Sequence, residues 1–173
     1  MALEAPGQRI LLPVNVGFMV LTILGALVFD LLPWPTMRGV PDLLALVLAF
    51  WCIREPRRMG IAIPFLLGLV MDAANGVLMG QHALAYSVLA FLATTISRRV
   101  LWFGLLPQAL HVLAILLLAQ TIMVLVRMIV GGPFPGFSYF VGSFISAALW
   151  PLMSAVLLAP QRRPETVDET RPI

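Results

Sequence analysis

Charge is scarce in this chain, and the scarcity excludes most soluble proteins. Asp, Glu, Arg and Lys together make up 11% of the 173 residues, whereas a soluble domain carries roughly 25%. Lysine is absent, so every basic charge comes from arginine, and the net charge is +3. In so apolar a chain, arginine reports membrane topology rather than affinity for nucleic acid, and we expect no nucleic-acid partner.

Catalytic and metal-binding patterns are also missing from the sequence. There is no P-loop, no G-x-S-x-G sequence and no pair of carboxylates at a catalytic spacing. The two histidines lie far apart, without Cys or carboxylate at ligand spacing. The single cysteine, Cys52, excludes an internal disulfide. We therefore expect no enzymatic activity, no catalytic residue, no metal site and no cofactor.

Hydrophobic residues dominate instead. They make up 61% of the chain, the mean hydropathy is +1.00, and apolar runs fill most of residues 10–159. This predicts an all-α integral membrane protein, a six-helix transmembrane bundle, with an N-terminal segment at 1–9 and a disordered tail at 160–173. The predicted spans are 10–32, 41–53, 60–76, 82–97, 105–128 and 137–159.

One of these spans leaves the helix count open. A helix over 41–53 is about 20 Å long, against about 30 Å for the hydrocarbon core of a bilayer. If it only dips into the cytoplasmic face, five helices cross and the N-terminus lies outside. If it crosses, both termini are cytoplasmic.

Arginines orient the chain in either case, because the cytoplasmic side of a membrane protein is enriched in them. With six spans, only Arg38 and Arg127 fall outside, and the C-terminus is cytoplasmic under both counts. The clusters also suit anionic lipid or an acidic cytoplasmic partner. The arginines that set the topology are Arg54, Arg57, Arg58, Arg98, Arg99, Arg162 and Arg163.

Four residues recur at four-residue spacing within one apolar run: Gly68, Asp72, Gly76 and Gly80. On one continuous helix they form a face that a neighbouring helix can approach closely, in this chain or in a partner. A carboxylate at mid-bilayer costs about 2.5–3.5 kcal/mol on insertion scales, so Asp72 needs a compensating role.

Several roles for Asp72 stay open. It can bond local backbone near a helix end, contact another helix, or bind an ion or substrate, with Asn75 in support. Arg127 is a candidate counter-charge. The helix either breaks at the turn-prone Asn75-Gly76 or continues to Gly80. Elsewhere, Trp34 and Trp150 are predicted membrane-interface anchors, and Asp30 is expected to be solvated at that interface.

Several short motifs resemble, in order and spacing, those of the rod shape-determining MreD family. The resemblance covers about residues 30 to 155. Its motifs are Leu32-Pro33-Trp34-Pro35, Pro41-Asp42-Leu43-Leu44 leading into Trp51, the Gly68-to-Gly80 series continued by Ala83-Leu84, Gln108-Ala109-Leu110 and Leu149-Trp150-Pro151.

The resemblance implies a multi-pass protein of the bacterial inner membrane that serves the elongasome, the complex that builds lateral-wall peptidoglycan. It implies a non-enzymatic scaffold that binds MreC and works indirectly with MreB, RodA and a class B penicillin-binding protein. Membrane lipid is a further expected partner, and a homo-oligomer stays open. The implied architecture is similar to the S components of energy-coupling-factor transporters.

That architectural similarity supplies the alternative function, a vitamin-binding subunit of a transporter. Such a subunit requires an enclosed polar pocket near the outer face. The candidate groups for that pocket are Asn75, Gln81, His82, Ser138 and Tyr139. A proton-coupled carrier that uses Asp72 is a third hypothesis, and it requires further buried ionisable groups.

Overall fold

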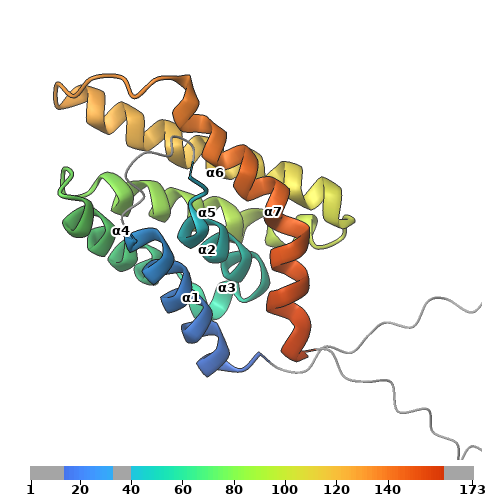
Figure 1. Cartoon of the computed structure of the whole chain (residues 1–173). Coiled ribbons are helices and arrows are strands. Elements are labelled where there is room, and N and C mark those ends of the chain that lie inside the picture. Colours follow the sequence, from blue (N-terminus) through green and yellow to red (C-terminus); the bar gives the residue numbers. More distant parts are fainter. Residues whose placement is uncertain (1–13, 33–39, 162–173) are drawn as a thin grey trace, which may run out of the picture.

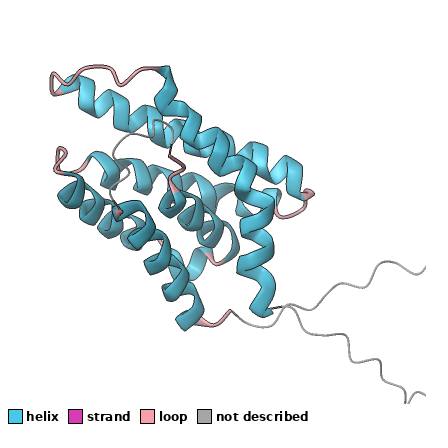
Figure 2. Cartoon of the chain, viewed as in Figure 1, coloured by secondary structure: helices cyan, strands magenta, loops and turns pink. Residues whose placement is uncertain are grey.

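The computed structural model describes residues 14–32 and 40–161. Within these ranges the backbone forms helices joined by short loops, with no strand (Figures 1 and 2). The helices are α1 (Val16–Leu31), α2 (Leu43–Arg54), α3 (Pro56–Met59), α4 (Ala62–Asn75), α5 (Gln81–Val100), α6 (Leu105–Ile129) and α7 (Val141–Leu158). Short 3-10 turns at Phe137–Phe140 and Ala159–Gln161 flank α7.

The all-helical prediction is confirmed, and each predicted apolar run holds one long helix. The one-turn helix α3 lies between the second and third runs. By length and hydropathy alone, two segments are suited to cross a membrane, Leu105–Ile129 and Phe137–Gln161. Helices α1, α2 and α4 are apolar but shorter than 18 residues. The count of six spans therefore stays a prediction.

Helix α2 forms the centre of the bundle. Every residue from Leu44 to Ile53 is buried, and the helix packs against α1, α5, α6 and α7 (Figure 1). A helix that is apolar on all sides belongs in a protein interior. Phe50 contacts both Trp51 of the same helix and Trp150 of α7, with ring centroids 5.0 and 5.8 Å apart. These aromatic contacts tie the short second helix to the rest of the core.

The buried N-terminus of α2 is closed by two carboxylates. Asp42, the N-cap residue, accepts a hydrogen bond from the Ala45 amide at 2.7 Å. Asp30, at the end of α1, accepts from the amides of Leu43 and Leu44 at 3.3 and 2.7 Å. The first N–H groups of a helix have no intrahelical partner. Asp30 is therefore a half-buried capping residue between helices, a role that its predicted place at the membrane interface did not include.

Trp150 is not a membrane-interface anchor, and that prediction is wrong. Its side chain is 1% exposed, because it packs on α2 in the core. Its indole N–H donates to Gln108 Oε1 of α6 at 3.2 Å, which satisfies the one polar group of the ring. Trp34, the other predicted anchor, lies outside the described residues.

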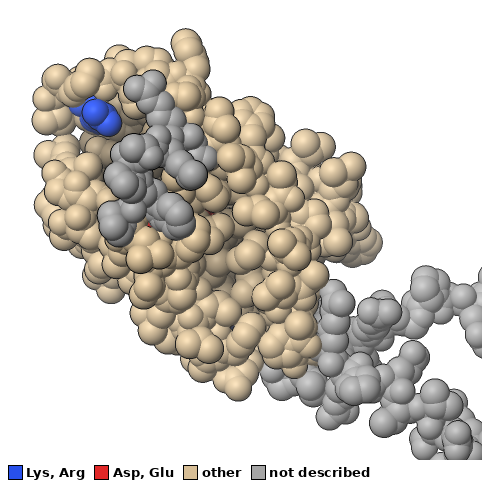
Figure 3. Space-filling model, in the orientation of Figure 1, with Lys and Arg blue, Asp and Glu red and all other residues tan. Residues whose placement is uncertain are grey.

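The bundle has two chemically different ends. One end carries the α4–α5 and α6–α7 connections together with the N-terminus of α2. The opposite end carries α3 and the α5–α6 turn, where five arginines lie: Arg54, Arg57, Arg58, Arg98 and Arg99. Arg162 and Arg163 lie outside the described residues. We refer to the two as the carboxylate end and the arginine end. In the view of Figure 3, the described surface is uncharged apart from one basic patch and traces of acidic atoms.

Candidate functional site

Asp72 lies at the carboxylate end and is fully buried, with 0% exposure. Its carboxylate accepts hydrogen bonds from the amides of Gly80, His82 and Ala83 at 2.8, 2.7 and 3.3 Å. The His82 ring contributes a fourth contact, with Nδ1 2.7 Å from Oδ1. All four donors belong to the N-terminus of α5, where the helix dipole also favours negative charge.

Asp72 thus provides the cap that the α5 sequence lacks. The N-cap residue of α5 is Gly80, which has no side chain to accept a hydrogen bond. The carboxylate reaches it from α4, one turn before that helix ends at Asn75. Two of the roles considered for Asp72 are present in the structure. Asp72 bonds backbone amides at a helix end, and that helix is the neighbouring α5.

Gly68 permits this arrangement by letting two helices meet. A methyl group at its Cα would lie 2.4 Å from the Cα of Ala83 and 2.7 Å from the carbonyl carbon of His82. These are backbone atoms of the first turn of α5, so they have no rotamer with which to move aside. The close approach brings Asp72, one turn further along α4, to the start of α5.

Of the two predicted courses of this helix, the structure shows the break at Asn75-Gly76, so the four residues do not share one continuous helix face. Helix α4 ends at Asn75, and Gly76 follows in the left-handed conformation with φ of 60°. Gly80 has φ of 103° and begins α5. Neither has another atom within 4 Å of an added Cβ. Gly76 and Gly80 are required by the turn conformation, in which L-residues are strained, and not by helix contact.

Arg127 does not contact Asp72 in the described part of the chain, where the side-chain contact of Asp72 is with the His82 ring. Arg127 is exposed in the last turn of α6, where a cation suits the helix dipole. Its carbonyl accepts from the Gly132 amide at 2.9 Å, and its side chain packs against Gly132.

A polar cavity of about 440 Å³ opens beside this network at the carboxylate end. Segments from six parts of the chain line it, and the Tyr86 hydroxyl donates to the Asp42 carboxylate at 3.1 Å. Gln120 links the α6–α7 side of the cavity, since its Oε1 accepts from Ser143 at 2.7 Å. The polar lining residues are Asp30, Asp42, Asn75, His82, Tyr86, Gln120, Ser138 and Tyr139.

Of the five groups predicted for an outer pocket, all but Gln81 line this cavity. Sequence reasoning missed Asp42, Tyr86 and Gln120. Asp42 carried a usable signal, because an Asp immediately before an apolar helical run is a typical N-cap. Tyr86 also carried one, because it lies four residues after His82 and so shares its helical face. The three carboxylates of this end, Asp30, Asp42 and Asp72, each accept backbone N–H groups at the start of a helix.

Comparison with known proteins decides the family. The model of the rod shape-determining protein MreD family matches residues 9–159. The chain belongs to the MreD family. It is also 31% identical over 144 residues to the rod shape-determining protein MreD of Haemophilus influenzae (strain ATCC 51907 / DSM 11121 / KW20 / Rd), covering 80% of this chain and 86% of that protein. No solved structure matches the chain.

Membership of the MreD family gives the protein a role in rod shape determination and a place in the membrane. The family is a shape-determining component and is not known as an enzyme family. Since Asp72 and Gly68 make their contacts within the chain, between α4 and α5, substitutions at both positions should change the stability of the fold.

Replacing Asp72 by Ala leaves three amides at the start of α5 without their acceptor. Since each unsatisfied buried group costs about 1–3 kcal/mol, we expect a destabilisation of about 3 kcal/mol or more. Asp72→Asn keeps one acceptor oxygen, so its stability should lie between those of the wild type and of Asp72→Ala. Thermal unfolding of the purified protein in detergent measures the difference. Glu55→Gln is the control and should change stability little. The carboxylate it removes belongs to a partly exposed ion pair with Arg58 at 3.6 Å, and such surface pairs contribute little to stability. An Asp72→Ala protein that melts with the wild type contradicts the capping role.

Substitution of Gly68 by Ala should push α4 away from α5. We expect this overpacking to lower the free energy of unfolding by about 1–3 kcal/mol or more, and the melting temperature with it. Gly25→Ala is the matched control, since a methyl group at this α1 position meets nothing within 4 Å. It should be neutral or stabilising by up to about 1 kcal/mol, as Ala favours helix more than Gly. Equal melting temperatures for the two variants would exclude the close helix contact.

Proposed function

We propose that this MreD-family protein is a non-enzymatic membrane scaffold of the bacterial cell-wall elongation complex and that it binds MreC. Through MreC it serves MreB, RodA and a class B penicillin-binding protein. The observation that carries the proposal is the family match over 9–159, which covers the helices α1 to α7. We place the protein in the inner membrane, with six spans and the arginine end in the cytoplasm.

The geometry of the described residues supports a scaffold whose buried polar groups bond to other parts of the same chain and stabilise its fold. Gly68 and Asp72 are buried between α4 and α5 and leave no surface for a partner. In this proposal MreC contributes a single transmembrane helix, which must therefore bind to an outward face. The outer face of α1 suits it: Gly25 is exposed there, between the exposed side chains of Leu21, Leu24 and Val28. A small residue within an apolar face lets a second helix backbone approach closely.

Depletion of the protein in its host tests the shape role directly. We expect rod-shaped cells to round into spheres as the protein is lost, and the wild-type gene supplied in trans to restore rods. Rods that persist after complete depletion would overturn the proposed role.

Gly25→Leu tests the partner face. The added side chain fills the space that a second backbone would occupy, so we expect recovery of MreC with the tagged protein to fall about tenfold, a loss of about 1.4 kcal/mol. Gly104→Leu is the matched control, because that glycine also meets nothing within 4 Å and lies in the α5–α6 turn. Equal recovery of MreC with both variants refutes the α1 face, and no recovery with the wild type refutes MreC binding.

The cavity at the carboxylate end favours a second candidate function, an S-component-like subunit that binds a vitamin. Its volume of about 440 Å³ lies within the range of about 300–1,000 Å³ that small-molecule sites occupy. Tyr86 and Asp42 form a hydrogen-bonded pair in its wall.

Native mass spectrometry and thermal-shift screening with water-soluble vitamins test this second candidate. It requires a retained or stabilising vitamin whose affinity falls about tenfold in Tyr86→Phe, as expected for the loss of one hydrogen bond of about 1.4 kcal/mol. Leu21→Ala, on the outer face of α1, is the control. A protein that purifies empty and shows no shift with any vitamin counts against transport.

A further inference from the structure

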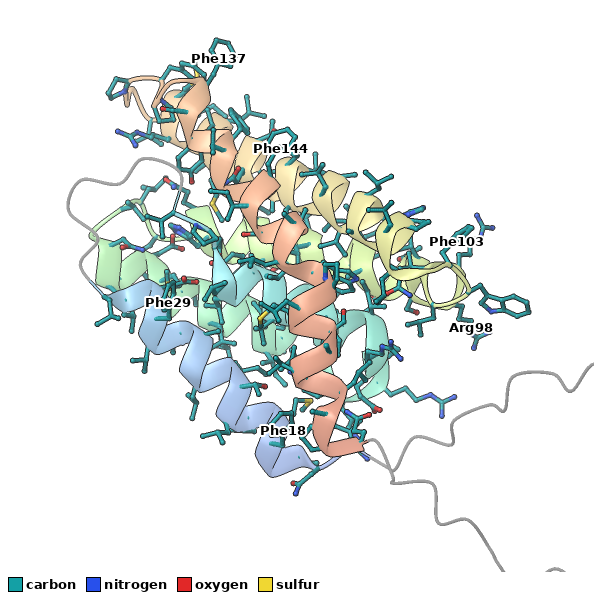
Figure 4. The ribbon with its side chains drawn as sticks, turned by 45° about the vertical axis from the view of Figure 1, so that its right-hand side comes forward. Phe18, Phe29, Arg98, Phe103, Phe137 and Phe144 are labelled. Carbon is teal, nitrogen blue, oxygen red and sulfur yellow. The ribbon has the colours of Figure 1, made fainter. Side chains whose placement is uncertain are left out.

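A second cavity lies at the opposite, arginine end, beside the α5–α6 turn. It has a volume of about 580 Å³, and its walls include Arg98, Arg99, Trp102, Phe103 and His111. Figure 4 shows Arg98 and Phe103 close together at the tip of the α5–α6 pair, pointing away from the bundle. Its lining is almost entirely apolar apart from the cationic and imidazole groups. It therefore combines a basic rim with an apolar floor.

The two arginines of this cavity are free to bind an anion. Within the described part of the chain, neither Arg98 nor Arg99 has an ion pair or a side-chain hydrogen bond. Arg58 differs, since it contacts Glu55 and donates to the Val14 carbonyl at 2.9 Å. A guanidinium carries five N–H donors in a planar fork that matches the oxygens of a phosphate.

His111 is held in place beside these arginines. Its Nδ1 donates to the Pro107 carbonyl at 2.8 Å, which requires the proton on Nδ1 because a carbonyl only accepts. Its ring stacks on Phe103, with centroids 5.5 Å apart and planes inclined by 17°. These contacts leave Nε2 as a further polar group of the cavity wall.

Aromatic and aliphatic groups extend the cavity into the region that lipid occupies. Trp102 is 91% exposed, which is typical of a ring at the membrane–water interface. From His111, an exposed apolar stripe continues along α6 through Leu110, Ala114 and Leu118. An acyl chain needs a track of this kind directly beside the phosphate site.

We propose that the cavity at the α5–α6 turn binds one anionic phospholipid. The phosphate lies against Arg98 and Arg99, and an acyl chain follows the stripe of α6. Charge complementarity selects a lipid of net negative charge over a zwitterionic one. Basic pockets between transmembrane helices on the cytoplasmic side bind anionic headgroups in this way. The site shares no residue with the proposed MreC face of α1 or with the cavity at the carboxylate end.

The experiment titrates the purified full chain with phosphatidylglycerol and, separately, with phosphatidylcholine, and counts bound lipids by native mass spectrometry. We expect one phosphatidylglycerol to bind at least tenfold more tightly than phosphatidylcholine. Arg98→Gln and Arg99→Gln should each weaken it about fivefold. Leu110→Asn should also weaken it, because it interrupts the acyl track. Arg57→Gln is the charge-matched control and should change the affinity less than twofold, since Arg57 does not line the cavity.

Three outcomes overturn the proposal. An equal loss of affinity in Arg57→Gln shows that total charge alone attracts the lipid. Equal binding of phosphatidylglycerol and phosphatidylcholine shows that the site does not select charge. Displacement of the lipid by millimolar inorganic phosphate, with Leu110→Asn indistinguishable from the wild type, shows an ion site without an acyl track. The melting temperatures of the arginine variants should match the wild type, because both side chains lie on the surface.

Discussion

Closure of buried helix ends by carboxylates is the constraint on which this fold depends. Helices α2 and α5 both begin in half-buried surroundings, where their first N–H groups have no intrahelical acceptor. Asp30 and Asp42 provide the acceptors for α2, and Asp72 provides them for α5. Because Asp30 lies on α1 and Asp72 on α4, each cap also joins two helices. Most of the few acidic residues in the described part of the chain therefore cap helices.

That use of charge separates the two ends of the bundle. The carboxylates turn inward at one end, around a polar cavity, while arginines with unused donors remain at the other. The faces between are apolar and suit lipid or a partner helix. In our proposals, the apolar helix faces bind a partner helix and the arginine-rich rim binds an anionic lipid. The scaffold and lipid proposals use these two surfaces without competing for the same residues.

The four-residue spacing of the glycine series predicted some contacts correctly and others wrongly. Its four-residue period correctly drew attention to Gly68 and Asp72, which lie together against α5. The same period misled at Gly76 and Gly80, because a left-handed turn places glycines in sequence as readily as a helix face does. Trp150 misled for another reason. A tryptophan beside a proline reads as an interface residue, yet it fills the core beside Phe50.

The sequence by itself determined the helical class, the resemblance to the family and the order of the long helices, although α1 begins six residues after the start of its predicted run. Those properties depend on local quantities: the length of apolar runs, the turn residues between them and the order of short motifs. Only the tertiary structure decided what each polar residue contacts. Asp72 finds its donors eight to eleven residues away across a turn, and Tyr86 meets Asp42 from a helix 44 residues distant. Such pairings depend on the close approach of backbones at Gly68 and on the central placement of α2, which no single segment encodes.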